Sequence, residues 1–553
     1  FIGGAVNNGT LAPNVAAGAI TFAGTTFSCA INGTTDIVYF NGSVFNGPVT
    51  LTKTNTGNNY SIGGNTFNDS LTLTNTAGRQ YMYYTLNDVY NGNVVLNSSG
   101  TSGGIWLGQN TGSGTLASGM TLSIGGGGFS IGSLVIGRLI QLGATPQSII
   151  TTGTSTLHVR DGSVFNGALT GSAPGLYIQN TTFNANATFI KTGNTNEYSS
   201  GGCVFNGTTE FSNSGIGFLA LNNTGVDTFN GDVKFNSSGS GGFRFGYSGG
   251  SWDQASGYTI MIGAGGFSAG ALGLGRFTQL GPSNITLVMT GTSSFFYNPG
   301  TLFLGNVDVT APTVFLNGAT FSGSAKFTKT GSSNDYSTGG NVFNGSMEFL
   351  NSSSALFCPH YTGIDVFNGP LLVNNTGTGS IRFGLSGGTS TLATGNTINV
   401  GASGFTSGQL YINGLTQVGA TPQNIAFTGS AGIYFGSGTT FNGPLTVVSP
   451  SIGLNGSTFN ADVSLTKTGS LNDVCTGGNT FNGTLDLTNT STGTIYLYHY
   501  ANDSFNGNIR FGSTSTGQIL LGQFSGTATL AAGYTIAAGA SGFVAGFLTI
   551  GKL

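Results

Sequence analysis

One long internal repeat limits the fold of this chain more than any other feature of its sequence. A lysine recurs at one constant interval, at Lys53, Lys191, Lys329 and Lys467. Four such intervals account for all 553 residues to within one residue. The repeat units span approximately residues 1–138, 139–276, 277–414 and 415–553. A chain that repeats over its full length is typical of a solenoid, in which each repeat packs only against its neighbours.

A shorter rhythm runs inside each unit, and the tripeptide Phe-Asn-Gly marks it. Markers in the second unit follow one another at similar intervals, and Phe267 and Phe303 continue the series at wider ones. Counting the wider intervals as two steps each predicts about seven sub-repeats of roughly 20 residues, a length typical of one solenoid coil. The complete markers of units two to four include Phe165-Asn166-Gly167, Phe205-Asn206-Gly207, Phe229-Asn230-Gly231, Phe343-Asn344-Gly345, Phe367-Asn368-Gly369, Phe481-Asn482-Gly483 and Phe505-Asn506-Gly507.

The residues that follow a marker alternate between apolar and polar. After Phe481 come Leu485 and Leu487, with Asp486 between them. A period of two with one apolar face is the signature of a half-buried strand, and Gly, Asn and Thr are poor helix formers. The sequence therefore predicts an all-β fold, a parallel β-solenoid (β-helix) with coils of about 20 residues. We expect residues 1–553 to form one continuous solenoid of four tandem 138-residue repeats.

The Asn-Gly pair of the marker predicts the corners between strands, because both residues tolerate positive φ. The preceding Phe can then point inward. Stacked coils would place Phe over Phe and Asn over Asn, in ladders of like residues. About 28 coils at a spacing of about 4.8 Å would advance about 33 Å per unit.

Charge is scarce, which excludes several functions. Charged residues make up 6% of the chain and the net charge is −3, so there is no basic stripe for nucleic acid. No apolar run reaches the roughly 20 residues that cross a bilayer, so we expect no membrane insertion in this segment. Hydrophobic residues nevertheless reach 38%, with 41 Phe, enough for a core. Because little repulsion keeps such rods apart, we expect self-association into a homo-oligomeric filament or bundle.

One charged pattern recurs at the end of a strand. An acid stands at the sixth position after the lysine, in the pairs Lys191 and Glu197, Lys329 and Asp335, and Lys467 and Asp473, while Asn59 holds this place in the first unit. The lysine is in phase with the inward residues, so we expect a partly buried ion pair that fixes a corner. A repeated glycan-contact site is the functional alternative.

The remaining polar patterns predict no metal, cofactor or catalytic residue. Asp88, Asp227, Asp365 and Asp503 precede markers and suit turn hydrogen bonds. Calcium would need several clustered acids and a nonapeptide that this chain lacks. Gly125–Gly128 predicts a turn and not a phosphate loop, since no Gly-Lys-Ser/Thr follows. The four cysteines, Cys29, Cys203, Cys358 and Cys475, have no common spacing and predict isolated buried thiols.

An enzyme is the least favoured class. β-Helices that cut polysaccharides need two acids, or acids with a basic residue, at one place. The charges here are spread at the repeat interval, and no unit differs from its copies in that way. We therefore expect no catalytic activity.

The strings Thr-Phe-Asn-Gly, Leu-Thr-Lys-Thr-Gly and Gly-Gly-Asn-Thr-Phe-Asn-Gly recur along the whole chain. In these strings the sequence resembles the β-strand-repeat giant adhesins and surface filament proteins of gliding and predatory bacteria. The resemblance implies secretion across the outer membrane by a type IX route. It also implies display on the bacterial cell surface, as extracellular fibres that attach to surfaces, other cells or glycans.

Two structural alternatives stay open. The rod either carries a gripping tip located elsewhere, or its own surface binds sister chains or glycans. An ice-binding solenoid is a further alternative, since regular Thr arrays can match a lattice. In the sequence the Thr positions vary between coils, which argues against ice binding.

Overall fold

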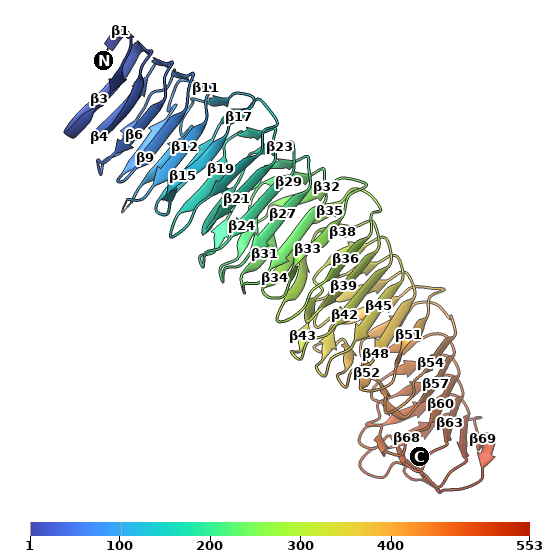
Figure 1. Cartoon of the computed structure of the whole chain (residues 1–553). Coiled ribbons are helices and arrows are strands. Elements are labelled where there is room, and N and C mark those ends of the chain that lie inside the picture. Colours follow the sequence, from blue (N-terminus) through green and yellow to red (C-terminus); the bar gives the residue numbers. More distant parts are fainter. Residues whose placement is uncertain (1, 101) are drawn as a thin grey trace. The chain divides into compact units, whose positions relative to one another are not determined.

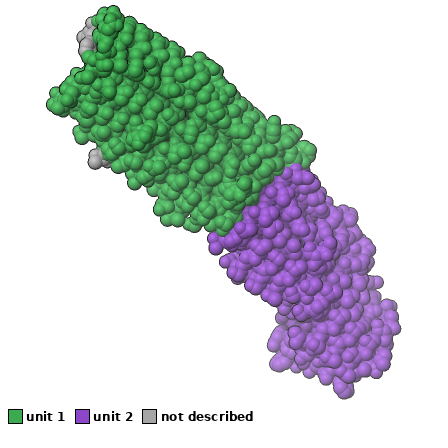
Figure 2. Space-filling view, viewed as in Figure 1, with its two compact units in different colours: residues 1–283 green, residues 284–553 purple. Residues whose placement is uncertain are grey.

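The chain folds as a parallel β-solenoid. The computed structural model describes residues 2–100 and 102–553, and these residues contain no helix. The solenoid has about 23 turns of roughly 23 residues, which confirms the expected fold class. Contacts divide the chain into two compact units, Phe1–Ser283 and Asn284–Leu553, coloured green and purple in Figure 2. They are called unit 1 and unit 2 below, and the four repeat units of the sequence are called repeats. The count of four repeats and the single continuous domain stay predictions.

After the long N-terminal strands β3 (Asn14–Phe27) and β4 (Ala30–Asn41), each coil contributes one strand to each of three faces, and Figure 1 shows the strands of successive coils side by side. In residues 139–276, face 1 consists of β17 (Leu139–Gln141), β20 (Val164–Phe165), β23 (Thr182–Phe183), β26 (Val204–Phe205), β29 (Val226–Phe229) and β32 (Ser251–Gln254). Face 2 consists of β18 (Gln147–Ile150), β21 (Leu169–Ala173), β24 (Ala187–Lys191), β27 (Thr209–Asn213), β30 (Val233–Ser237) and β33 (Ile260–Phe267). Face 3 consists of β19 (Thr156–Arg160), β22 (Gly175–Ile178), β25 (Glu197–Tyr198), β28 (Leu219–Leu221), β31 (Gly242–Phe245) and β34 (Ala271–Gly275).

The second repeat therefore holds six coils, and the prediction of seven is wrong. On face 1, Phe229 pairs with Gln254, and Gln254 pairs with Gln279 of β35 (Phe277–Gln279). Glutamine thus takes the marker position in two coils. Phe267, which we counted as a marker, ends the long strand β33 on face 2, where it pairs with Ser237 after a register shift. Six coils at about 4.8 Å give a rise of about 29 Å per repeat.

Inward side chains form the core, because alternate residues of each strand point to opposite sides of its sheet, one toward the interior of the solenoid and the next toward the outside. In β24 the buried positions are Ala187, Phe189 and Lys191. The marker rings stack in register along each unit, with parallel planes: Phe183 and Phe205 are 5.0 Å apart, and Phe205 and Phe229 are 4.6 Å apart. This is the like-over-like stacking that the sequence pattern predicts.

The marker asparagines form a second ladder on the outside. The amide Nδ2 of Asn206 donates to Oδ1 of Asn184 at 2.7 Å, and that of Asn230 donates to Oδ1 of Asn206 at 2.8 Å. In unit 2, Asn482 and Asn506 continue a ladder of the same kind at 2.7 and 2.8 Å. Each such bond contributes about 0.5–1.5 kcal/mol.

The marker glycines have a different role from the one we predicted. None of the marker Asn-Gly pairs of the second, third and fourth repeats has positive φ, although Gly42 of Phe40-Asn41-Gly42 in the first repeat does, at 75°. A Cβ on Gly231 would instead lie 2.3 Å from the carbonyl oxygen of Gly207, in the preceding coil. Glycine is needed there because the coils approach closely. The left-handed corners belong to the double glycines, such as Gly201 and Gly202, with φ of 92° and 85°.

Gly231→Ala is therefore expected to destabilise the second repeat by about 1–3 kcal/mol, because the backbone of the preceding coil must shift. Gly126→Ala is the matched control, since nothing lies within 4 Å of a Cβ at that position. Thermal unfolding of both variants measures the difference. Equal melting temperatures would show that the preceding coil accommodates a Cβ at position 231 without loss of stability.

Gly125–Gly128 does not form the expected turn. These residues lie in β15 (Leu122–Phe129), a long strand of face 2. The pairing of β15 with β12 (Val94–Ser98) shifts register between Leu96 and Ser98. A Cβ on Gly125 would lie 2.8 Å from the side chain of Asn97, so the run of glycines lets this bulged strand cross its neighbour.

Candidate functional surfaces

Two of the three predicted lysine–acid pairs form at the corner between faces 2 and 3. Lys329 ends β42 (Ala325–Lys329), and its Nζ lies 3.2 Å from Oδ1 of Asp335. Lys467 ends β60 (Val463–Lys467), and its Nζ lies 3.0 Å from Oδ2 of Asp473. All four side chains are buried. Lys329 also donates to the carbonyls of Pro312 and Gly331, at 3.2 and 2.9 Å.

The pair predicted for Lys191 and Glu197 does not form. Nζ of Lys191 donates to the carbonyl of Gly193 at 2.5 Å, while Oε1 of Glu197 accepts from the hydroxyl of Thr195 at 2.5 Å. The side chain of Glu is one methylene longer than that of Asp, and Glu197 turns instead to the hydroxyls of Thr195 and Tyr177.

In the first repeat a carbonyl pair replaces the acid. Nζ of Lys53 donates to the carbonyls of Asn55 and Ala77, at 2.6 and 2.5 Å. Burial lowers the pKa of Lys53 to about 8, against the attraction of Asp36. The corner thus accepts a buried ammonium with or without a carboxylate partner.

A buried asparagine supports the same corner one coil later, and we did not predict it from the sequence. Asn213 pairs with Lys191 along face 2, and its Nδ2 donates to the carbonyls of Gly217 and Gly242, each at 2.9 Å. The amide therefore ties its own loop to that of the next coil. The signal was present, because the equivalent residues recur at the same interval as the lysines, at Asn75, Asn213, Asn351 and Asn489.

The aspartates before the markers bind the preceding coil and not their own turn. Oδ1 of Asp503 accepts from the backbone N–H and from Nδ2 of Asn479, at 2.8 and 3.0 Å. Oδ1 of Asp227 accepts from the backbone N–H of Cys203 at 2.8 Å. Burial raises the pKa of Asp227 and of Asp503 to about 7, and these hydrogen bonds only partly oppose it.

This burial predicts a pH dependence of stability. The folded chain holds protons on Asp227 and Asp503 up to a pH of about 7, whereas unfolded aspartates release theirs near pH 3.9. Their contribution to stability is therefore full below about pH 4 and is lost as the pH rises through 7. At about 1.36 kcal/mol for each pKa unit, the titration of Asp503 lowers the free energy of unfolding by about 4 kcal/mol over this window.

Asp503→Asn should remove that share of the dependence, leaving the variant more stable than the parent at pH 7.5 and not at pH 4. Denaturant midpoints between pH 4 and 7.5 measure it. This range lies below the titration of Lys53, whose lowered pKa favours folding as the pH rises above 8. Burial also lowers the pKa of His158 to about 4, and this titration favours folding as the pH rises through the same range, so the variant is compared with the parent at each pH. A difference between variant and parent that does not grow from pH 4 to 7.5 would contradict the assignment.

The outer row of face 1 is a ladder made mostly of Thr and Val, one residue from each coil, with Ile140, Asp253, Leu302 and Ser504 as the exceptions. In unit 1 it runs through Thr66, Val89, Thr115, Ile140, Val164, Thr182, Val204, Thr228, Asp253 and Thr278. In unit 2 it runs through Leu302, Thr320, Val342, Val366, Thr391, Thr416, Thr440, Thr458, Thr480, Ser504 and Thr529. In unit 1 the Thr positions vary between coils, as the sequence indicates, whereas Thr391, Thr416, Thr440, Thr458 and Thr480 hold this position in successive coils of unit 2.

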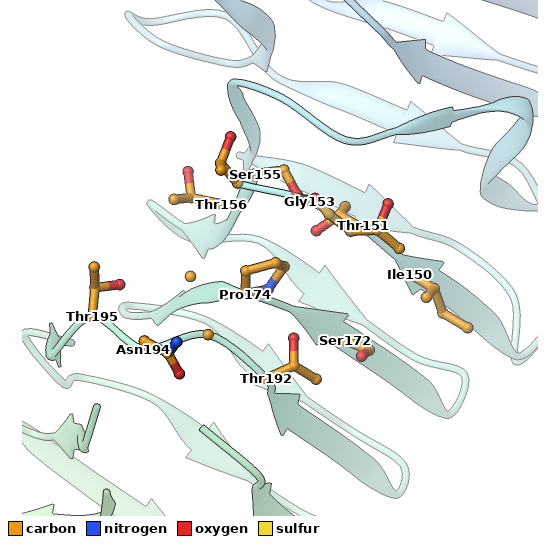
Figure 3. A pocket seen from close by; sticks show the side chains of 14 residues that line it. Ile150, Thr151, Gly153, Ser155, Thr156, Ser172, Pro174, Thr192, Asn194 and Thr195 are labelled. Atoms are coloured by element: carbon orange, nitrogen blue, oxygen red, sulfur yellow. Dashed lines mark hydrogen bonds between the residues drawn. The ribbon is translucent and has the colours of Figure 1, made fainter. Parts of the chain in front are cut away.

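A groove of about 550 Å³ opens between faces 2 and 3 of the second repeat (Figure 3). Its origin is a short connection, since Pro174 alone joins β21 to β22 while the loops of the adjoining coils are longer. Figure 3 shows Pro174 between these two loops, with Thr151 on one side and Thr192 on the other. The lining residues carry hydroxyls and an amide and no charge, so the groove suits a neutral polar group.

Aromatic side chains gather on the outside of face 3, a feature that we missed in the sequence. In the first repeat, Tyr60 of β7 (Asn59–Tyr60) stacks on Tyr81 of β10 (Arg79–Met82), with centroids 4.4 Å apart. Trp106 adjoins Tyr81, and Cζ of Arg79 lies 4.6 Å from the centroid of the Trp106 ring.

The second and third repeats carry clusters on the same face. Tyr198, Phe218 and Tyr247 lie within 6.0 Å of one another, and Cζ of Arg244 lies 4.2 Å from the centroid of Phe218. In unit 2, Cζ of Arg382 lies 3.8 Å from the centroid of Tyr411. A repeat signal exists, since Tyr60, Tyr198 and Tyr336 share the interval of the lysines and are 43%, 43% and 45% exposed.

The cysteines and histidines form no cluster of their own. Cys29, Cys203, Cys358 and Cys475 are free and buried. In residues 2–100 and 102–553, no group of three His, Cys, Asp or Glu side chains is placed to hold a metal ion. The described part of the chain also has no helix with the length and apolar character of a membrane span.

The marker residues occupy the positions described above for their ladders. The rings of Phe165, Phe205, Phe229, Phe343, Phe367, Phe481 and Phe505 are buried on face 1. Compared with known proteins, the chain matches no protein-family model, no curated protein and no solved structure. Its function therefore has to be argued from the residues themselves.

Proposed function

We propose that this chain is a structural repeat segment of an extracellular bacterial filament or adhesin, with an attachment role and no catalytic one. The observation that carries the proposal is the pair of ladders, one of stacked Phe rings and one of Asn amides, that continue from coil to coil. Such ladders add the same contacts with every further coil, so they favour length. A localised active site would gain nothing from this repetition.

The low charge and the hydroxyl- and amide-rich faces support side-by-side association of such rods. We propose a homo-oligomeric filament or bundle displayed on the cell surface. Sedimentation across a range of concentrations tests it, since a chain that stays monomeric on concentration would contradict the bundle.

Cryo-electron microscopy of filaments from the native source tests the filament itself. Six coils per repeat predict layer lines at about 4.8 Å and about 29 Å. The expected image is a rod with both periods, and it would show how many chains run in parallel. Discrete globular particles without an axial repeat would refute the proposal.

Ice binding is the second candidate, and the Thr and Val ladder of face 1 favours it. In unit 2 the ladder presents a Thr side chain in each of the successive coils of Thr391, Thr416, Thr440, Thr458 and Thr480, at a spacing of about 4.8 Å. Thermal hysteresis of the purified chain is the test. Hysteresis that disappears in Thr458→Tyr, where a bulky ring interrupts the row, would support this function, and absence of hysteresis in the parent would exclude it.

A further inference from the structure

Each of the first three repeats holds a guanidinium against an aromatic ring on the outside of face 3. The distances from Cζ to the ring centroid are 4.6, 4.2 and 3.8 Å, for Arg79 on Trp106, Arg244 on Phe218 and Arg382 on Tyr411. All three are within the range of a cation–π contact. The pairing is thus a repeated element of this surface.

The contact persists although the residues exchange places between the first two repeats. Gln80 pairs with Asn59 as Leu219 pairs with Glu197, so Arg79 is equivalent to Phe218. By the same register Trp106 is equivalent to Arg244. Cation and ring have therefore swapped positions while their contact is kept, which simple copying of a repeat would not produce.

Two of these guanidinium groups have N–H donors without an acceptor in the described part of the structure. Among the described residues, Arg244 and Arg382 make no hydrogen bond or ion pair, and the Nε of each is buried without an acceptor. A guanidinium offers five donors in a planar fork that matches a carboxylate. Arg160 differs, since its Nε lies 3.1 Å from Oδ2 of Asp161. The guanidinium groups of Arg244 and Arg382 are therefore positioned to bind an external anion.

The distribution of charge points the same way. On face 2 the outward charges neutralise one another, as with Lys326 and Glu348, 3.5 Å apart, and with Asp486 beside Arg510. The described strands of face 3 carry Arg79, Arg160, Arg244 and Arg382 on their outer side, whereas the acids Glu197, Asp335 and Asp473 are buried. Face 3 is thus locally cationic on a chain whose net charge is −3.

We propose that face 3 binds an acidic polysaccharide of the polyuronate class, with sugar rings packed on the exposed rings of Tyr198 and Tyr247 and a carboxylate held by Arg244. The rings supply flat apolar area beside a polar hydroxyl, which suits the amphipathic face of a sugar. The guanidinium, held in place by Phe218, supplies a charge-assisted bidentate bond. The equivalent site of the third repeat uses Arg382 with Tyr411 and Tyr434, whose rings stack at 4.9 Å.

Repetition makes a long ligand the best fit. Within unit 1 the clusters at Tyr60 and Tyr198 are one repeat apart, about 29 Å at six coils. A polysaccharide that spans this distance engages the second cluster at a high effective concentration, so weak single contacts add up to firm attachment. A single sugar would not gain this advantage.

Single-stranded nucleic acid also stacks on aromatic rings beside basic groups, but it needs a continuous positive groove. Here one unpaired guanidinium is available in each of two repeats, and acids remain on the outside of the neighbouring face. Polysaccharide is therefore the favoured partner, and nucleic acid becomes an outcome of the test.

The experiment measures binding of the full chain to immobilised alginate by biolayer interferometry, with dextran sulfate, neutral dextran and oligo(dT) as comparison ligands. Arg244→Gln combined with Arg382→Gln removes both forks. Lys234→Gln combined with Lys326→Gln is the matched control, because it removes the same charge from the outside of face 2. Equal melting temperatures show that the variants fold alike.

The expected result is binding to alginate and not to dextran, reduced at least tenfold by the arginine pair and less than twofold by the lysine pair. Equal loss in both variants, tighter binding to dextran sulfate or oligo(dT) than to alginate, or no binding to alginate would each overturn the proposal. The inference rests on the proposed surface location for access to such a polymer. The binding measurement uses the single chain, so its failure is distinct from a failure to form filaments.

Discussion

Phe205→Ala is expected to destabilise the second repeat by about 3–5 kcal/mol, the usual cost of removing a buried aromatic ring. The ring of Phe205 stacks between those of Phe183 and Phe229, at 5.0 and 4.6 Å, and contacts Phe211 edge-on at 6.1 Å. Because each coil packs only on its neighbours, the loss should stay local. Amide hydrogen exchange should show lost protection in the coils of β23, β26 and β29 and normal protection in distant coils.

Asn206→Ala is the matched control one position along the same coil. It removes one donor and one acceptor of the exposed amide ladder, and we expect a cost of about 1–2 kcal/mol. The ranking of the two variants tests which ladder holds the coils together. A larger effect from Asn206 would show that the outer amides, and not the inner rings, dominate.

Lys329→Met is the second large effect, with an expected cost of about 3–5 kcal/mol at pH 7.5. The substitution removes the ammonium donor from Oδ1 of the buried Asp335 and from the carbonyls of Pro312 and Gly331. Burial already raises the pKa of Asp335 to about 6, and the ammonium of Lys329 opposes this rise. Without the lysine the pKa rises further, so acid pH should neutralise Asp335 and restore much of the stability.

Lys53→Met provides the comparison, since that lysine bonds two carbonyls and has Asn59 in place of the acid. Its cost should be smaller and nearly constant between pH 5 and 7.5. Urea midpoints for both variants at pH 5 and 7.5 measure the difference. A cost for Lys329→Met that does not change with pH would show that the carboxylate of Asp335 does not depend on its partner.

Those parts of the fold that depend on residue type alone were readable from the sequence. Alternation such as Leu485-Asp486-Leu487 predicts a strand with one buried face, and the marker Phe and Asn predict their own ladders. The coil count failed because it took Phe267 for a marker and so divided the stretch from Phe229 to Phe303 into four steps instead of three. Gln254 and Gln279 hold the marker position in two coils, and only the hydrogen-bonded register shows it.

The surfaces were less predictable, because they combine residues from coils of unequal length. Arg244 and Phe218 belong to successive coils and meet only once the register of face 3 is known. The Thr and Val ladder of face 1 was hidden for the same reason. Lys191 and Glu197 have the spacing of a pair, but the length of one side chain decides the outcome.

The stacking of coils also decides how such a chain responds to mechanical load. A pull along the stacking axis does not strain all the bonds between coils at once, because the terminal coil can peel away while the rest stay folded. A released coil of roughly 23 residues extends to about 80 Å, against about 4.8 Å when folded. The chain would therefore lengthen in steps and dissipate energy at each one, so that a sudden tug is absorbed coil by coil before it reaches whatever lies at either end.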